Sequence, residues 1–175
     1  AVFPTDGALI PNDTTLTYDW QCVDVAPFTC SGSVGGLPVA VGDSLPTAPG
    51  TYTLDVTGTD VVGIATVNSV TFTVVEALAV TVDPTNLAGN GSGWYTGDVV
   101  VTVTGGGTIG YTLDGVGPAP ILTGESFTVT GEGLHTFVVT TDAGETIGGT
   151  IEIDSINPGG NDVMELIGRL DARPA

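Results

Sequence analysis

The chain has almost no basic residues. It contains no lysine and two arginines, Arg169 and Arg173, against 20 acidic residues, so its formal net charge is -18 at pH 7. Proteins that bind nucleic acid or anionic membranes need basic side chains to neutralise phosphate groups. The composition therefore argues against both kinds of partner, and the absence of lysine excludes Lys–Asn isopeptide cross-links. The acidic surplus is typical of a surface that keeps a protein soluble.

Cysteine and histidine are also scarce. The two cysteines, Cys22 and Cys30, are spaced to bridge adjacent strands or the base of a loop. A single pair in a β protein of extracellular character is more often a disulfide than a metal site. Zinc would need further ligands, and His135 is the only histidine. We therefore predict a Cys22–Cys30 disulfide and no metal centre.

Long hydrophobic runs are absent. No stretch approaches the roughly 20 apolar residues of a membrane span, and no signal peptide or initiator methionine opens the sequence. The first four residues, Ala-Val-Phe-Pro, are typical of a processed end. We expect any membrane anchor to lie outside this chain.

The residues that are abundant favour short strands and tight turns. There are 27 glycines and 11 prolines among many threonines and valines. One signature occurs twice, at 50–63 and at 133–144: a glycine, an alternating strand, Thr-Asp, a glycine turn and another strand. A unit used twice, roughly 80 residues apart, predicts two small all-β domains in tandem.

Alternating hydrophobicity locates the strands within these domains. In the first of them Leu16, Tyr18, Trp20 and Cys22 face one way, which predicts a buried aromatic face. The predicted strands are 14–22, 28–34, 39–41, 52–59, 64–75, 78–82, 99–103, 109–113, 127–130, 135–140 and 147–153. The predicted organisation is an N-terminal arm, 1–13, a first domain, 14–76, a second domain, 77–157, and a linker with a helical tail, 158–175.

The tail carries a helical pattern. Four apolar residues stand at i, i+3, i+4 and i+7, with acid before them and arginine at the end, which predicts a short amphipathic helix. They are Val163, Leu166, Ile167 and Leu170. We interpret this stripe as an assembly element. A frayed terminus, or a helix folded onto the second domain, are the alternatives.

Several short motifs stand out in the two domains. The first domain has Tyr18-x-x-x-Cys22, Cys30-Ser31-Gly32, Pro49-Gly50-Thr51-Tyr52 and Thr59-Asp60-x-x-Gly63; the second has Gly93-Trp94-Tyr95, Tyr111-Thr112-Leu113-Asp114-Gly115 and Thr141-Asp142-Ala143-Gly144. These motifs resemble bacterial Ig-like repeats of secreted, actinobacterial-type proteins. The resemblance covers about 140 residues. It implies two tandem Ig-like β-sandwiches of the kind strung along surface and secreted proteins.

Three residues are predicted to fix corners of the sandwiches. Asp60 and Asp142 each precede a glycine turn, where a carboxylate accepts hydrogen bonds from turn amides; a catalytic or calcium-binding role is the alternative. Tyr52 starts a late strand, as in the tyrosine corner of Ig-like sandwiches. His135 holds the matching place in the second domain, and we interpret it as a satisfied core residue.

The sequence contains candidate sites for two kinds of ligand, a sugar and a calcium ion. Trp94 and Tyr95 are a candidate platform for stacking on sugar rings, or else cover an edge of the core. Calcium is the one candidate cofactor, because calcium prefers oxygen ligands and residues that supply them lie close together in the sequence. The candidate ligands are Asp83, Asn86 and Asn90, or Asp154 and Asn157.

We predict a non-catalytic extracellular protein, because two domains this small rarely form the cleft that paired catalytic acids require. It is expected to be a structural or adhesive subunit, or a decoration, of a filament, cell-wall layer or virion. Its expected partners are other protein subunits or copies of itself, at a cell or virion surface. The alternative is a carbohydrate-binding accessory module with polysaccharide as its ligand.

Overall fold

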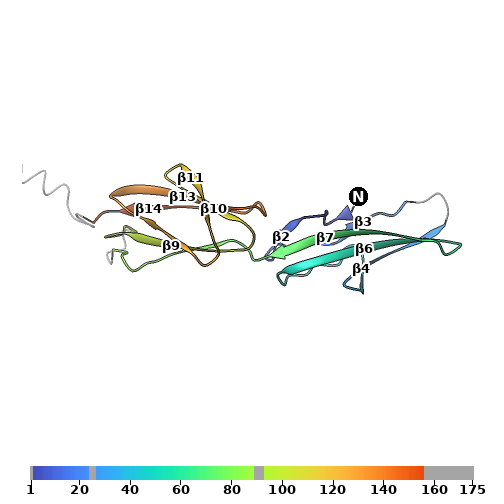
Figure 1. The fold of residues 1–175 in the computed structure, drawn as a ribbon. Helices are drawn as coiled ribbons and strands as arrows, with labels where there is room; N and C mark the ends of the chain where they lie inside the picture. The colour runs from blue at the N-terminus through green and yellow to red at the C-terminus, as the bar shows by residue number, and fades with distance from the viewer. Residues whose placement is uncertain (1, 24–26, 89–92, 156–175) are drawn as a thin grey trace, which may run out of the picture. The chain divides into compact units, whose positions relative to one another are not determined.

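The computed structural model describes residues 2–23, 27–88 and 93–155, and every regular element in these ranges is a β-strand. Two compact units form (Figure 1). The first contains Ala1–Ala79 with the turns Thr104–Ile109 and Thr140–Thr146, and the second contains Val80–Val103, Gly110–Val139 and the described residues from Ile147 on. The predicted helical tail, 158–175, lies outside the described residues.

The first sandwich consists of seven strands in two sheets. A two-stranded sheet pairs β1 with β3, and a five-stranded sheet has the order β2-β7-β6-β4-β5. All the pairs are antiparallel except β2 with β7, which is parallel. The bounds are β1 Val2–Phe3, β2 Leu9–Pro11, β3 Asp19–Trp20, β4 Phe28–Val34, β5 Leu37–Val39, β6 Gly50–Asp60 and β7 Ala65–Val75.

The core of this sandwich follows the alternation of its strands. Leu54 and Phe72 are completely buried, and each burial stabilises the fold by about 1.5–3 kcal/mol. Trp20 lies against Gly32, where a Cβ atom would meet the indole ring at 2.5 Å. The buried cluster comprises Ile10, Tyr18, Trp20, Leu45, Leu54, Val56, Val70, Phe72 and Val74.

Residues 2–11 are part of this sandwich, which corrects the prediction of a separate arm over 1–13. β2 pairs with β7 through Leu9–Thr73, Ile10–Val74 and Pro11–Val75, and Ile10 is buried. Pro4, Gly7 and Pro11 suggested irregular structure. In the fold they separate or end two short strands, a position in which proline is tolerated because an edge strand does not need every amide.

The second sandwich is formed by β8–β14. One sheet has the order β12-β9-β8 and the other the order β11-β10-β13-β14. Their facing sides bury residues such as Val101, Val103, Val129 and Val139, all with no exposed surface. The bounds are β8 Ala79–Val82, β9 Val99–Thr104, β10 Ile109–Leu113, β11 Val116–Ile121, β12 Ser126–Val129, β13 Gly133–Thr141 and β14 Thr146–Ile153.

The β10–β11 hairpin closes through Asp114 and Gly115, both with positive φ (50° and 76°), as a type I′ turn requires. Two facing antiparallel sheets, with one strand added in parallel at the edge of the first sandwich, are the arrangement of immunoglobulin-type sandwiches. The predicted fold class, all-β with two tandem Ig-like sandwiches, is confirmed.

Candidate functional site

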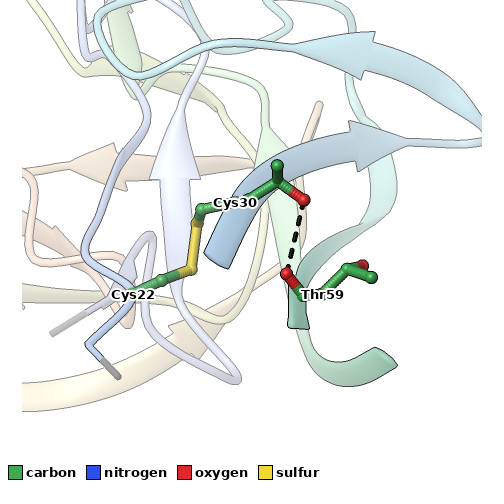
Figure 2. Close-up of a disulfide and its surroundings, with 4 residues drawn as sticks. Cys22, Cys30 and Thr59 are labelled. Atoms are coloured by element: carbon green, nitrogen blue, oxygen red, sulfur yellow. Dashed lines mark hydrogen bonds between the residues drawn. A yellow bond between two sulfur atoms is a disulfide. The ribbon is translucent and has the colours of Figure 1, made fainter. Parts of the chain in front are cut away.

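A disulfide fixes one end of the first sandwich. Cys22 follows β3 and Cys30 lies in β4, and their sulfur atoms are bonded with the Cα atoms 6.2 Å apart (Figure 2). Cys30 stands opposite Gly58 of β6, and the hydroxyl of Thr29 donates to the carbonyl of Thr59 at 3.5 Å. The predicted disulfide is present, and it ties the residue after the short strand β3 to β4.

The β6–β7 hairpin ends in a three-residue loop at this same place. The amide of Asp60 donates to the carbonyl of Ile64 and that of Gly63 to the carbonyl of Asp60, both at 3.1 Å. Asp60 Oδ1 accepts from the amides of Val62 at 2.9 Å and Ile64 at 2.8 Å. Gly63 takes the positive φ (86°) that this loop needs. The geometry therefore depends on Asp60 and Gly63 and makes no demand on the side chains between them.

Those side chains are nevertheless aliphatic and exposed. Val61 is 70% exposed and Val62 76%, with Ile64 at 67% beside them. Two hollows flank this tip, one of about 300 Å³ and one of about 160 Å³, and both are lined by Phe28 and Asp60. We call this surface the apolar tip; its members are Val23, Phe28, Val61, Val62 and Ile64.

The equivalent hairpin of the second sandwich provides an internal comparison. Thr141 N donates to Glu145 O at 3.1 Å, Gly144 N to Thr141 O at 3.0 Å, and Gly144 has φ 88°. The hydroxyl of Thr141 accepts from the Glu145 amide at 3.2 Å, as Asp60 does from Ile64. The same turn is thus built around Asp142 and Ala143 in place of two valines.

Asp142 bonds differently from the sequence-based expectation. Its Oδ1 accepts from the amide of Thr108, at 3.0 Å, and its own amide donates to the Thr108 carbonyl, at 3.1 Å. The repeated Thr-Asp signature predicts that Asp142 takes the same position in its loop as Asp60 takes in the first. Counted from the Thr-Asp pair, the glycine comes one residue sooner in the second copy, so Thr141 occupies the capping position and Asp142 instead holds the neighbouring turn.

The corner residues occupy matching places on β6 and β13. The hydroxyl of Tyr52 donates to the carbonyl of Ala48 at 2.9 Å, and its ring stacks on Phe72 with centroids 5.6 Å apart. His135 Nε2 lies 3.0 Å from the carbonyl of Gly131. Both bonds reach back four residues, which is the geometry of a tyrosine corner.

His135 also contacts a carboxylate. Its Nδ1 lies 2.7 Å from Asp114 Oδ2, while Asp114 Oδ1 accepts from the amide of Thr136 at 2.8 Å. Because both ring nitrogens face acceptors, the doubly protonated imidazolium satisfies the site best. The bond to Asp114, followed by that to Gly131, raises the pKa of His135. The same contact lowers the pKa of Asp114. Both ring nitrogens of His135 thus have partners and its side chain on β13 is only 15% exposed, although the residue is not one of the fully buried core residues.

The aromatic pair Trp94–Tyr95 lies along the edge of the second sandwich. Tyr95 bridges Ile153 in parallel: its amide donates to Glu152 O at 2.9 Å and its carbonyl accepts from Asp154 N at 2.8 Å. The carbonyl of Trp94 accepts from Ala88 N at 2.8 Å. Both side chains are half-buried. The backbone thus fixes the pair at an edge of the sheet.

A further hollow lies on the first sandwich, beside the β4–β5 hairpin. Its volume is about 600 Å³ and it is open to solvent. Val34, Leu37, Val39 and Tyr52 contribute apolar surface, together with Tyr18, whose pKa is raised by burial. The lining also includes the hydroxyl-bearing residues Ser44, Thr51 and Thr53, and none of the lining residues in the described part of the chain is acidic, basic or a histidine.

Two of the candidate calcium ligands, Asp83 and Asn86, make hydrogen bonds within the protein. Asp83 Oδ1 accepts from the amide and hydroxyl of Thr85, which lowers the pKa of Asp83. Asn86 Nδ2 donates to the carbonyl of Asp98 at 2.7 Å. Asn90 and Asn157 lie outside the described residues. Within 2–23, 27–88 and 93–155, no group of three or more His, Cys, Asp or Glu side chains is placed to hold a metal ion.

No family model and no curated protein matches the chain. Solved structures do. SGBP-B of the Bacteroides ovatus mixed-linkage glucan utilization locus, in complex with a mixed-linkage heptasaccharide, is 13% identical over 88% of this chain and 70% of its own, with a TM-score of 0.34. The 282-residue C-terminal fragment of intimin, in complex with the intimin-binding domain of its translocated receptor, is 17% identical over 87% and 64%, with a TM-score of 0.44.

A third similar structure is the N-terminal four Ig domains of Dscam1 isoform 6.9, at 15% identity over 86% of this chain and 43% of that one, with a TM-score of 0.39. The chain thus spans less than two thirds of the intimin fragment and of the Dscam1 piece. In the part of the chain that the structure describes, no helix is long and apolar enough to cross a membrane.

The sequence analysis did not single out the apolar tip. The signal was present, because the two hairpin loops align as Asp60-Val61-Val62-Gly63 and Thr141-Asp142-Ala143-Gly144. Two adjacent valines in a tight turn are unusual, since turns favour glycine, proline, asparagine, aspartate and serine. Comparing the two copies position by position would have drawn attention to them.

Proposed function

We propose that this chain is a non-catalytic extracellular module that acts by protein–protein contact, as a structural or adhesive part of a larger surface assembly. We also propose that it belongs with the bacterial Ig-like repeats of secreted proteins that its motifs resemble. The observation that carries the functional proposal is the apolar tip. A disulfide persists in oxidising surroundings, and the Cys22–Cys30 bond therefore supports an extracellular location.

The apolar tip favours binding because the fold does not require it. The β13–β14 hairpin has the same backbone bonds with Asp142 and Ala143 in its loop. Leaving Val61, Val62 and Ile64 in water costs solubility without stabilising the turn. A contiguous apolar patch rimmed by polar residues is typical of a surface that meets another protein.

The contacts of the titratable residues support a non-catalytic role. His135 is engaged by Asp114 and by the carbonyl of Gly131. Asp60 accepts from two amides of its own loop, and Asp142 from the amide of Thr108. These groups stabilise turns and corners, so each has a structural task that accounts for its presence.

Self-association of the purified chain tests this proposal. Sedimentation velocity is measured over a range of concentrations at low and at high salt. Salt should promote association because it screens the repulsion between chains of charge -18. Val61→Ser with Val62→Ser should weaken it. Val116→Ser with Leu122→Ser, which alters similarly exposed residues of the second sandwich, is the matched control. A wild-type chain that stays monomeric throughout would count against the proposal.

Carbohydrate binding is the second candidate, because the backbone holds the half-buried residues Trp94 and Tyr95 at a sheet edge. Affinity electrophoresis in gels containing soluble plant, bacterial and fungal polysaccharides tests it. Retardation that Trp94→Ala abolishes, and that Val61→Ser with Val62→Ser leaves unchanged, would favour this candidate.

A further inference from the structure

We propose that the apolar tip of one copy receives the segment 161–173 of a second copy, so that copies join head to tail. This rests on the proposed function and names the partner of the same surface. The segment lies outside the described residues, and the argument uses its sequence. The receptor is the described end of the first sandwich, with Val61, Val62 and Ile64 exposed beside the disulfide.

The two surfaces match in apolar character. The tip offers four exposed aliphatic side chains and two hollows of about 300 and about 160 Å³ that are both lined by Phe28 and Asp60. The segment offers a single stripe, Val163, Leu166, Ile167 and Leu170. A helix that binds a protein groove uses anchors at this i, i+3, i+4, i+7 spacing. An isolated helix of this length is marginal in water, so docking would also stabilise it.

Charge selects this segment over the rest of the chain. Arg169 and Arg173 are the only Lys or Arg residues of the chain. Asp60 lines both hollows at the tip. An arginine–carboxylate pair between two copies must therefore come from this segment, and both arginines lie at its far end, where they outnumber acids from Leu166 onward.

Contact between two apolar tips is disfavoured by the same charges. It would place Asp60 of one copy near Asp60 of the other with no cation in either, in chains that each carry -18. A contact between two different surfaces avoids this. Because such a contact leaves one tip and one segment free at the ends, it propagates into rings or filaments.

A labelled peptide provides the direct test. A fluorescent peptide of residues 158–175 is titrated into the full chain carrying Leu166→Ser and Leu170→Ser, whose own segment is disabled while its tip is intact. Saturable binding is expected by fluorescence anisotropy. Adding Val61→Ser and Val62→Ser to the target should weaken binding roughly tenfold or more, as loss of central anchors does. Val116→Ser with Leu122→Ser should leave binding unchanged.

The arginines are tested in the peptide. Arg169→Glu with Arg173→Glu should weaken binding at low salt more than at high salt, since screening reduces the charge term. A peptide with Leu166→Ser and Leu170→Ser should not bind. Equal binding of the wild-type peptide to targets with valine and with serine tips would show that the tip is not the receptor.

Two further outcomes separate the inference from the proposed function. If the wild-type chain associates and the tip variant does not, yet the peptide fails to bind, the proposed function stands and the inference is overturned. If the peptide binds but the wild-type chain remains monomeric, the segment docks on its own chain, and the second-copy assignment is overturned. Association lost in both the tip variant and Leu166→Ser with Leu170→Ser supports the inference.

Discussion

His135 in the second sandwich takes the place that Tyr52 holds in the first. Each residue stands two positions after a glycine near the start of a late strand, and each bonds the backbone carbonyl four residues earlier, at 3.0 Å and 2.9 Å. The histidine adds a contact that tyrosine does not make, because its second ring nitrogen meets Asp114 at 2.7 Å. The histidine corner is therefore expected to be sensitive to pH.

The His135–Asp114 pair predicts how the stability of the second sandwich depends on pH. The raised pKa of His135 stabilises the fold fully below its unfolded pKa, about 6.5, and this contribution is lost as pH rises through the folded value. The lowered pKa of Asp114 contributes above about 3.9 and is lost in acid. The pair should stabilise most between these limits.

Urea unfolding between pH 4 and pH 9, with Trp20→Phe leaving Trp94 as the probe of the second sandwich, measures this dependence. Asp114→Asn is the control and should flatten the alkaline loss. NMR titration of the His135 ring gives its pKa directly. A ring that titrates at or below the value of a free histidine would contradict the assignment.

Removing the disulfide should destabilise the first sandwich. Cys22→Ser with Cys30→Ser should lower the free energy of unfolding by roughly 2–3 kcal/mol, because the short loop regains its freedom in the unfolded chain. Urea denaturation of the variant and of the oxidised wild type gives the difference. Mass spectrometry of the unreduced protein should show the loss of two hydrogens, and two free thiols in freshly isolated protein would be inconsistent with the structure.

Gly32→Ala should disturb the aromatic core. The new methyl group would lie 2.5 Å from the Trp20 ring, so ring or strand must shift, at a cost of about 1–3 kcal/mol. Gly58→Ala on β6 is the matched control, because no atom lies within 4 Å of its added Cβ. Thermal unfolding and Trp20 fluorescence compare the two variants. Equal stability of both would show that the ring does not pack on Gly32.

Substitutions in the β6–β7 loop should distinguish a residue that stabilises the fold from residues that bind a partner. Asp60→Ala leaves the amides of Val62 and Ile64 without their carboxylate and should cost about 1–2 kcal/mol. Val61→Ser with Val62→Ser changes exposed side chains and should alter stability by less than about 0.5 kcal/mol. Chemical denaturation measures both. A large loss in the serine variant would mean that the valines serve the fold.

The strands of strict alternation could be predicted from sequence, since Leu54, Val56, Phe72 and Val74 alternate on β6 and β7 and all are buried. The segment 14–22 shows the limit of that signal. Tyr18 and Trp20 are buried as predicted, yet only Asp19–Trp20 joins a sheet. The amide of Tyr18 bonds Asp43 instead, and Leu16 O accepts from Leu45. Alternating hydrophobicity therefore predicts which side chains are buried, but it does not predict which segment the backbone forms hydrogen bonds with.

Strand β11 could not be predicted, because Pro118 and Pro120 remove two amides within it. It lies at a sheet edge, where one row of amides faces away from the sheet and is not needed. The candidate site was hidden for a different reason. Val61 and Val62 continue the apolar character of the flanking strands, so their exposure became evident only when the hairpin loop was located.

Proline also shapes how crowded copies of this chain can meet. Pro11 in β2, Pro38 in β5 and Pro118 with Pro120 in β11 all stand in outermost strands of their sheets. A strand with missing amides is a poor template for adding a strand from another molecule. Edge-to-edge pairing of sheets from different molecules leads to amyloid-like aggregates. The prolines disfavour such pairing at these three sheet edges. Along these three edges, contact between molecules through side chains is therefore favoured over the addition of a strand.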